Sequence, residues 1–209
     1  MEQFRPRLLQ AAVQMSVTLS EHQQNQLLRY LALFARWNSA YNLSAIRDPA
    51  QMLERHIIDS LSIVNLCGTG SLIDVGSGGG LPGVPLAIVY PTRPITLLDS
   101  NGKKARFLFQ VANSLSLHNV QVVNERAEKL SVAQPFAGVV SRAFASMADM
   151  VDCSAHLLAL GGRFYAMKGR LPEDELSALP KGIMVEQVHR LSVPGCTAER
   201  HLILLSRTG

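Results

Sequence analysis

The chain has 209 residues, a formal net charge of +4, 47% hydrophobic residues and 17% charged residues. This composition excludes a disordered chain, and the length suits one α/β domain with an extension rather than two full domains. No apolar run is long enough to span a membrane, and the first residues lack the apolar core of a secretory signal. We therefore expect a cytoplasmic protein.

Two further features of the composition bear on function. The three cysteines have neither metal-type nor redox-type spacing, which fits a reducing compartment and predicts no metal site. Arginine outnumbers lysine by 15 to 5. Because guanidinium groups match phosphates and guanine edges, this bias points gently toward nucleic acid.

The first third of the chain, residues 1–67, predicts a helical extension. Residues 4–17 suit a helix, although the pattern there is mixed. Ser20 to Gln23 has the form of a capping box, and apolar residues at helical spacing predict a helix over 21–38. Asp48 and Pro49 start another helix in the same way, and its apolar face continues to about residue 66.

From residue 68 onward, short apolar runs alternate with helical patterns. This alternation predicts a parallel sheet with helices on both faces, in a Rossmann-like α/β domain over 68–209. The expected strands are 72–75, 95–98, 120–123, 138–141, 163–167, 185–193 and 201–205, and the expected helices are 82–89, 103–117, 146–158 and 173–179.

A glycine-rich turn follows the first of these strands, in the register Asp74-x-Gly76-x-Gly78-x-Gly80. Glycines let the backbone turn sharply and approach a nucleotide-like ligand. A carboxylate at Asp74 can face an ammonium group, such as that of the methionine end of S-adenosylmethionine, whereas a pyrophosphate would avoid the charge. The turn therefore favours an S-adenosylmethionine-dependent methyltransferase over a nicotinamide or flavin enzyme, although a glycine motif alone is weak evidence.

Acidic residues after the next two strands predict the rest of a nucleoside site. Asp99 ends the second strand, where a carboxylate can accept both ribose hydroxyls, although it could instead cap the following helix. Ala127 and Glu128 follow the third strand, where methyltransferases hold the adenine edge. The alternative for Glu128 is an ordinary pair with Lys129 or Arg126.

Arg142 follows the end of the fourth strand, on the side from which the methyl acceptor usually approaches. A cation there could hold the cofactor carboxylate or an RNA phosphate, or form a structural ion pair with Asp74. No Asn/Asp-Pro-Pro-aromatic motif follows this strand, and neither Cys67 nor Cys153 is placed as a covalent nucleophile. A ring nitrogen such as guanine N7 needs neither a base nor a nucleophile, so we expect no catalytic residue beyond those that position the reactants.

Four segments together resemble one family. They are residues 37–49, Arg-His-x-x-Asp-Ser at 55–60, the glycine turn, and Ser-Arg-Ala-Phe-Ala-Ser at 141–146. The resemblance runs from about residue 20 to the C-terminus and is to the bacterial ribosomal RNA small subunit methyltransferase G family (RsmG, or GidB). It implies N7 methylation of a guanine in 16S rRNA with S-adenosylmethionine. It also places cofactor contacts at Gly76, Leu81, Ala127, Glu128 and Arg142, beside Asp74, Gly78 and Asp99.

The same resemblance suggests substrate contacts. Arg55, His56, Asn42 and Lys168 are candidates for placing RNA or closing the cofactor pocket. The alternative for the helical segment is an ordinary ion pair between Arg55 and Asp59, four residues apart. The expected partner is 16S rRNA or a small-subunit particle, and the protein is expected to be a monomer. The rival hypotheses are a methyltransferase of small molecules or proteins, and a non-catalytic nucleotide-binding regulatory module.

Overall fold

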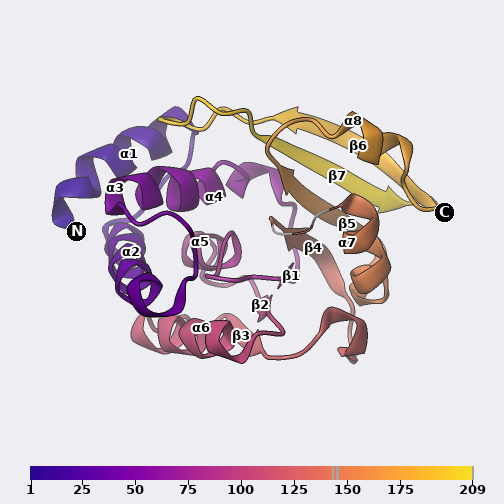
Figure 1. The fold of residues 1–209 in the computed structure, drawn as a ribbon, viewed down its shortest axis with the longest axis horizontal. Coiled ribbons are helices and arrows are strands. Elements are labelled where there is room, and N and C mark those ends of the chain that lie inside the picture. Colours follow the sequence, from indigo (N-terminus) through magenta and orange to yellow (C-terminus); the bar gives the residue numbers. More distant parts are fainter. Residues whose placement is uncertain (143, 145, 209) are drawn as a thin grey trace.

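A computed structural model describes residues 1–142, 144 and 146–208. Its centre is a seven-stranded sheet in the order β3-β2-β1-β4-β5-β7-β6 (Figure 1). The first five strands run parallel, and β7 is antiparallel to both β5 and β6. The strands are β1 Leu72–Val75, β2 Ile95–Leu98, β3 Val120–Val123, β4 Phe136–Ser141, β5 Leu158–Lys168, β6 Ile183–Arg190 and β7 His201–Arg207.

The helices begin close to their predicted positions. The main ones are α1 Arg5–Gln14, α2 Glu21–Tyr41, α5 Gly83–Val89, α6 Gly102–Ser114, α7 Met147–Ser154 and α8 Glu173–Ser177. At the start of α2 the Ser20 side chain accepts from the Gln23 N–H, and the Gln23 side chain accepts from the Ser20 N–H, which is the predicted capping box.

One predicted helix differs in its interior. The helix expected over 48–66 consists of α3 Pro49–Met52, a π-helical stretch Leu53–Ile58, α4 Asp59–Leu61 and a separate 3-10 turn Val64–Leu66. A π-helical stretch widens the turn and changes which side chains share a face, and such stretches often occur at functional sites. Periodicity predicted the helix but not this widening.

Two strand boundaries differ from their predicted positions by three residues or more. β5 begins at Leu158 rather than at residue 163, because α7 ends at Ser154 and a short 3-10 turn leads directly into the strand. Gly161 and Gly162, predicted to precede the strand, lie inside it, where its pairing with β4 is irregular. β6 ends at Arg190 rather than at residue 193.

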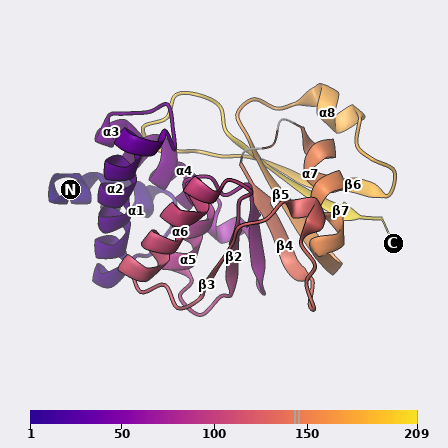
Figure 2. The same ribbon diagram turned by 60° about the horizontal axis from the view of Figure 1, so that its bottom comes forward.

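Helices cover both faces of the sheet. Figure 2 shows α1, α2, α5 and α6 on one side and α7 and α8 on the other. The core on the first side contains fully buried side chains from the extension, among them Leu8 and Leu27, together with Leu72 of β1. The Gln26 side chain of α2 donates to the Leu115 carbonyl at 2.8 Å. The extension and the sheet therefore share one hydrophobic core.

Across the part of the chain that the structure describes, no helix is long and apolar enough to cross a membrane.

Candidate active site

The glycine turn folds as its sequence predicts. Gly76, Gly78 and Gly80 have φ angles of 71°, 60° and 86°, a region in which side chains are strained. The Gly78 N–H donates to Asp99 Oδ2 at 2.8 Å, which ties the turn to the end of β2. Leu81 is buried at the end of the turn.

The extension packs directly on this turn. The Tyr30 hydroxyl donates to the Gly79 carbonyl at 2.5 Å, and a methyl group at position 79 would stand 2.3 Å from the Phe34 ring. Gly79 is therefore required by a close approach of α2, a reason that the motif alone did not reveal.

The Asp74 carboxyl group lies beneath the turn rather than in a cavity. It is fully buried, and its Oδ2 accepts the Gly83 N–H at the start of α5 at 2.9 Å. Its Oδ1 has no hydrogen-bond partner among the described residues. Burial raises the pKa of Asp74 to about 7. The predicted contact between Asp74 and a cofactor stays a prediction, because the structure directs this group toward α5.

A cavity of about 300 Å³ opens at the carboxyl ends of β2 and β3, and we call it the β2–β3 cavity. It brings together four of the residues predicted to bind cofactor, Gly76, Asp99, Ala127 and Glu128. Its other lining residues are Val75, Leu98, Ser100, Lys104, Glu125, Arg126, Phe144 and Cys153.

Asp99 and Glu128 each had an alternative role, as a helix cap and as an ion-pair partner, and the structure shows neither role. The cap of α6 is Asn101, whose side chain accepts from Lys103 and Lys104 N–H groups, so Asp99 is not the helix cap. Asp99 Oδ1 instead accepts the Asn101 N–H at 2.8 Å. Within the residues described, Glu128 forms no ion pair with Lys129 or Arg126, and its side chain is exposed.

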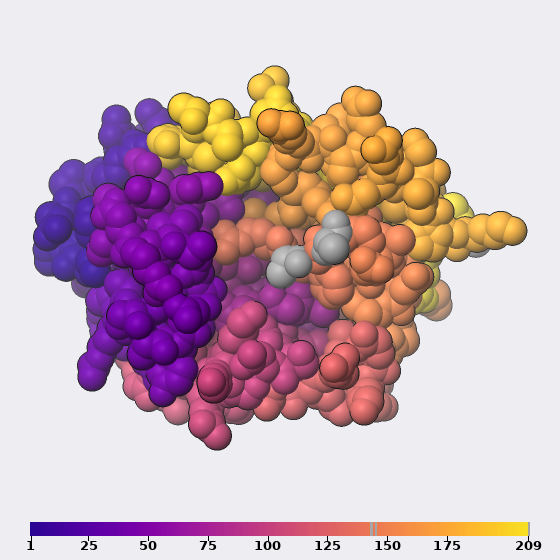
Figure 3. All heavy atoms as spheres, viewed as in Figure 1, coloured from indigo at the N-terminus to yellow at the C-terminus, as the bar shows by residue number. Residues whose placement is uncertain are grey.

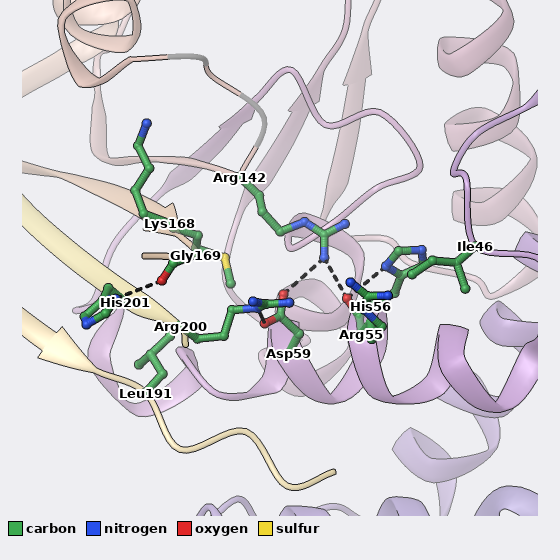
Figure 4. A pocket seen from close by; sticks show the side chains of 11 residues that line it. Ile46, Arg55, His56, Asp59, Arg142, Lys168, Gly169, Leu191, Arg200 and His201 are labelled. Atoms are coloured by element: carbon green, nitrogen blue, oxygen red, sulfur yellow. Dashed lines mark hydrogen bonds and ion pairs between the residues drawn. The ribbon is translucent and has the colours of Figure 1, made fainter. Parts of the chain in front are cut away.

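A second cavity, of about 250 Å³, opens at the carboxyl ends of β4 and β5, and we call it the β4–β5 cavity. It brings together Arg55, His56, Arg142 and Lys168, all of them predicted site residues (Figure 4). Figure 3 shows a hollow in the middle of this face, between the purple atoms of the α2–α3 region and the orange atoms on the opposite side. The remaining lining residues are Ile46, Asp59, Met167, Gly169, Leu191, Arg200 and His201.

Asp59 connects three parts of the β4–β5 cavity. Its Oδ2 lies 3.2 Å from Arg142 Nη1, and its Oδ1 lies 2.9 Å from Arg200 Nε. The Asp59 side chain is 4% exposed. The expected alternatives, an Arg55–Asp59 pair and an Arg142–Asp74 pair, are therefore wrong. Arg200 was not predicted at all, because nothing in the residues around it marks a site.

His56 forms the wall of this cavity in its neutral form. Its Nδ1 lies 2.9 Å from the Arg55 carbonyl, which accepts only if Nδ1 carries the proton. Its Nε2 lies 2.8 Å from Ser44 Oγ and then accepts from that hydroxyl. Burial, assisted by the nearby Arg142 charge, lowers the pKa of His56 to about 4.

Of the other two predicted substrate contacts, Lys168 lies at the β4–β5 cavity and Asn42 does not. Lys168 Nζ lies 2.9 Å from Glu175 of α8 and 3.4 Å from the Phe144 carbonyl, at the rim of the β4–β5 cavity. Asn42 ends α2 in a left-handed conformation and accepts a hydrogen bond from Arg47. Asn42 lines neither cavity. Ala143 and Ala145 of the 141–146 segment lie outside the described residues.

Cys67 and Cys153 are both protonated at neutral pH. Cys67 is fully buried, and burial raises the pKa of its thiol to about 12. Cys153 lines the β2–β3 cavity, and burial raises its pKa to about 11. Neither thiol has the lowered pKa that a nucleophilic cysteine requires.

Similar solved structures show which fold this is. The glycopeptide N-methyltransferase MtfA, complexed with S-adenosyl-L-methionine, superposes with a TM-score of 0.63 over 74% of this chain and 88% of its own, at 11% identity. TYW2 of P. horikoshii superposes with a TM-score of 0.57 over 72% of this chain and 61% of its own, at 8% identity. The fold, with its glycine turn and two cavities at one sheet edge, is that of the class I S-adenosylmethionine-dependent methyltransferases.

Sequence comparison then identifies the family. Residues 23–203 match the model of GidB, the rRNA small subunit methyltransferase G family. A relative of that name from Pseudomonas aeruginosa LESB58 is 52% identical over 96% of this chain and 94% of its own length. Another, from Marinobacter nauticus, is 50% identical over 98% and 96%. The chain belongs to this family, and the predicted fold class, family and enzyme class are confirmed.

Proposed function

We propose that this protein transfers a methyl group from S-adenosylmethionine to N7 of a guanine in 16S rRNA, either as free RNA or in a small-subunit particle. The observation that carries the proposal is the family match over residues 23–203, with the predicted site residues gathered at one edge of the sheet. When bound, the cofactor supplies an electrophilic sulfonium methyl group. The residues of the chain bind and orient the reactants.

The β2–β3 cavity fits the nucleoside of such a cofactor. Asp99 faces it with a carboxylate whose two oxygens are already held by the Gly78 and Asn101 N–H groups, so the group is pre-oriented to accept ribose hydroxyls. Ala127 and Glu128 offer a backbone N–H and an acceptor for the adenine edge. In this proposal Gly76, Gly78 and Leu81 shape the turn beside the cofactor, and Asp74 supports it from beneath.

The β4–β5 cavity fits an anionic acceptor. Three guanidinium groups line it, two of them paired with its single carboxylate, Asp59, and the Lys168 ammonium at its rim is paired with Glu175. The guanidinium groups belong to Arg55, Arg142 and Arg200. This charge suits an RNA phosphate, or the cofactor carboxylate near Arg142, and it differs from the enclosed apolar pocket expected of an enzyme for small molecules.

Direct transfer agrees with the chemistry of the side chains. Guanine N7 carries an in-plane lone pair, so the reaction requires alignment with the methyl group and no proton acceptor. His56 is neutral and hydrogen-bonded at both ring nitrogens, and the thiols of Cys67 and Cys153 are protonated. We further propose a cytoplasmic monomer in which the extension (1–67) and the methyltransferase domain (68–209) act as one unit.

The test is methyl transfer from labelled S-adenosylmethionine to purified 16S rRNA and to small-subunit particles, with 23S rRNA as a control. Mass mapping of the product should place one methyl group on a guanine N7. RNA binding should weaken steeply with salt, as expected when several cations contact phosphates. Methylation of free guanosine as efficient as that of 16S rRNA would favour the small-molecule hypothesis. Cofactor binding without transfer to any RNA would favour the regulatory module.

A further inference from the structure

We propose that Asp59 is a positioning residue that orients Arg142 toward the bound anion. The inference rests on the proposed function, because it concerns how Arg142 meets its ligand in the β4–β5 cavity. The ligand that Arg142 would bind is a single anionic oxygen group, which either the cofactor carboxylate or an RNA phosphate can supply.

The contacts of Arg142 are one-sided. Its Nη1 lies 3.2 Å from Asp59 Oδ2 and 3.3 Å from the Arg55 carbonyl. The other two nitrogens, Nε and Nη2, have no hydrogen-bond partner among the residues described. Figure 4 shows them directed away from Asp59. One edge of the guanidinium is thus anchored, and the remaining N–H groups are available to an anion.

The carboxylate that anchors Arg142 is itself held rigidly. Arg200 Nε lies 2.9 Å from Asp59 Oδ1, so each carboxylate oxygen has its own guanidinium partner. The carboxylate also cannot swing freely into solvent, because its side chain is 4% exposed. A carboxylate shared between two guanidiniums leaves one positive charge over, which preserves the attraction for an anion.

Arg142 also lies where the two halves of the site meet. Burial raises the pKa of Asp74 beneath the glycine turn and the Arg142 charge opposes this rise, whereas in the wall of the β4–β5 cavity burial lowers the pKa of His56 and the Arg142 charge adds to this fall. A small reorientation of the Arg142 guanidinium therefore changes its distance both to a cofactor beside the glycine turn and to an anion in the β4–β5 cavity. Since Asp59 comes from α4, the extension would contribute to the site through this contact.

The experiment is a double-mutant cycle of Asp59→Asn and Arg142→Ala. Two affinities are measured for each variant: S-adenosylhomocysteine by calorimetry, and 16S rRNA by filter binding. Asp59→Asn should weaken at least one of them by about tenfold, the scale of a hydrogen bond to a charged group. In the Arg142→Ala background the same substitution should change that affinity by less than about twofold, because its effect passes through Arg142.

A matched control lies in the same helical segment. Glu54 pairs with Arg7 at 3.1 Å and lines neither cavity, so Glu54→Gln removes an ion pair while both affinities should stay unchanged. If Asp59→Asn does not fold, Asp59→Glu keeps the charge and displaces the carboxylate. It should then give a smaller loss that again vanishes in the Arg142→Ala background.

Two results would overturn the assignment. Equal losses in both backgrounds would mean that Asp59 merely stabilises the fold, and no loss in either would mean that Arg142 needs no anchor. Methyl transfer by the unchanged protein is recorded in parallel. A wild-type protein that methylates rRNA while the cycle shows no coupling refutes only the role of Asp59, whereas absence of transfer refutes the proposed function.

Discussion

The two cavities lie at the same edge of the sheet but differ in origin and in charge. Apart from Phe144 and Cys153, the β2–β3 cavity is built from residues between Val75 and Glu128, and three of them are acids. The β4–β5 cavity draws on the extension, on Arg142, on the end of β5 and on the approach to β7, and its charges are mainly positive. The β2–β3 cavity is therefore formed mainly by the ends of strands that follow one another in the chain. The β4–β5 cavity forms only when segments far apart in the sequence pack together.

This difference predicts different sensitivities. A cavity made from loops after adjacent strands depends on the individual side chains that face it. A cavity whose wall contains a buried imidazole depends in addition on the ionisation of that imidazole. A change in pH should therefore act at the β4–β5 cavity by changing the free energy of unfolding. A single substitution in the β2–β3 cavity should instead change the affinity for the cofactor.

The largest expected effect is a loss of stability in acid that is caused by protonation of His56. Its pKa is about 4 in the folded protein, against roughly 6.5 in an unfolded chain. Between these values the unfolded chain binds the additional proton, so the free energy of unfolding falls as pH is lowered, by about 3 kcal/mol in total. Above about pH 6.5 the contribution is fully present.

Urea unfolding between these pH values tests this expectation. His56→Gln cannot titrate, so its stability should fall less steeply than that of the wild type. His22→Gln, at an exposed position in the same extension, should keep the wild-type slope. Parallel pH profiles for wild type and His56→Gln would show that His56 does not couple acid to folding.

A smaller effect is expected from Asp99 in the β2–β3 cavity. Asp99→Ala should weaken binding of S-adenosylhomocysteine by about 1.5 to 3 kcal/mol, because a charged acceptor for the ribose is lost. Its loss also removes the acceptor that holds Gly78 of the turn. Asp152→Ala, at an exposed position on α7, is the matched control in the same calorimetric titration. An unchanged affinity in a folded Asp99→Ala variant would remove Asp99 from the site.

Arg142→Ala should have a still smaller effect on kcat/KM for rRNA methylation, of about 1.5 kcal/mol, or roughly tenfold. The guanidinium is partly exposed, with 25% of its side chain accessible, so solvent screens part of its contribution. If its ligand is a phosphate, the salt dependence of RNA binding should also become shallower. Arg163→Ala, which removes an ion pair with Glu186 outside both cavities, should leave kcat/KM near the wild-type value. Equal losses in the two variants would contradict a specific role for Arg142.

The same contrast explains what could be predicted from the sequence. Asp99, Ala127 and Glu128 were found because the carboxyl ends of parallel strands meet at one edge, so strand ends alone bring them together. Asp59 and Arg200 lie 141 residues apart, and only tertiary packing shows that they pair. The π-helical stretch before Asp59 has no signal in apolar periodicity.

The smallest expected effect is none, and it tests whether either cavity supplies a nucleophile or a base. Replacing Cys67 by alanine, and Cys153 and Cys196 by serine, should leave single-turnover methyl transfer within about twofold, because no thiolate takes part. The rate of the chemical step should also be flat from about pH 6 to 9, since N7 is unprotonated there and Asp74, whose pKa of about 7 falls in this range, lies beneath the turn and transfers no proton. The structure supports both expectations with a His56 that is neutral and thiols at Cys67 and Cys153 whose pKa values are raised. A trapped protein–RNA adduct would rule out direct transfer, and so would a rate of the chemical step that rises or falls with one ionisation within this range. Cys153 would then be the first group to re-examine, because it lines the β2–β3 cavity.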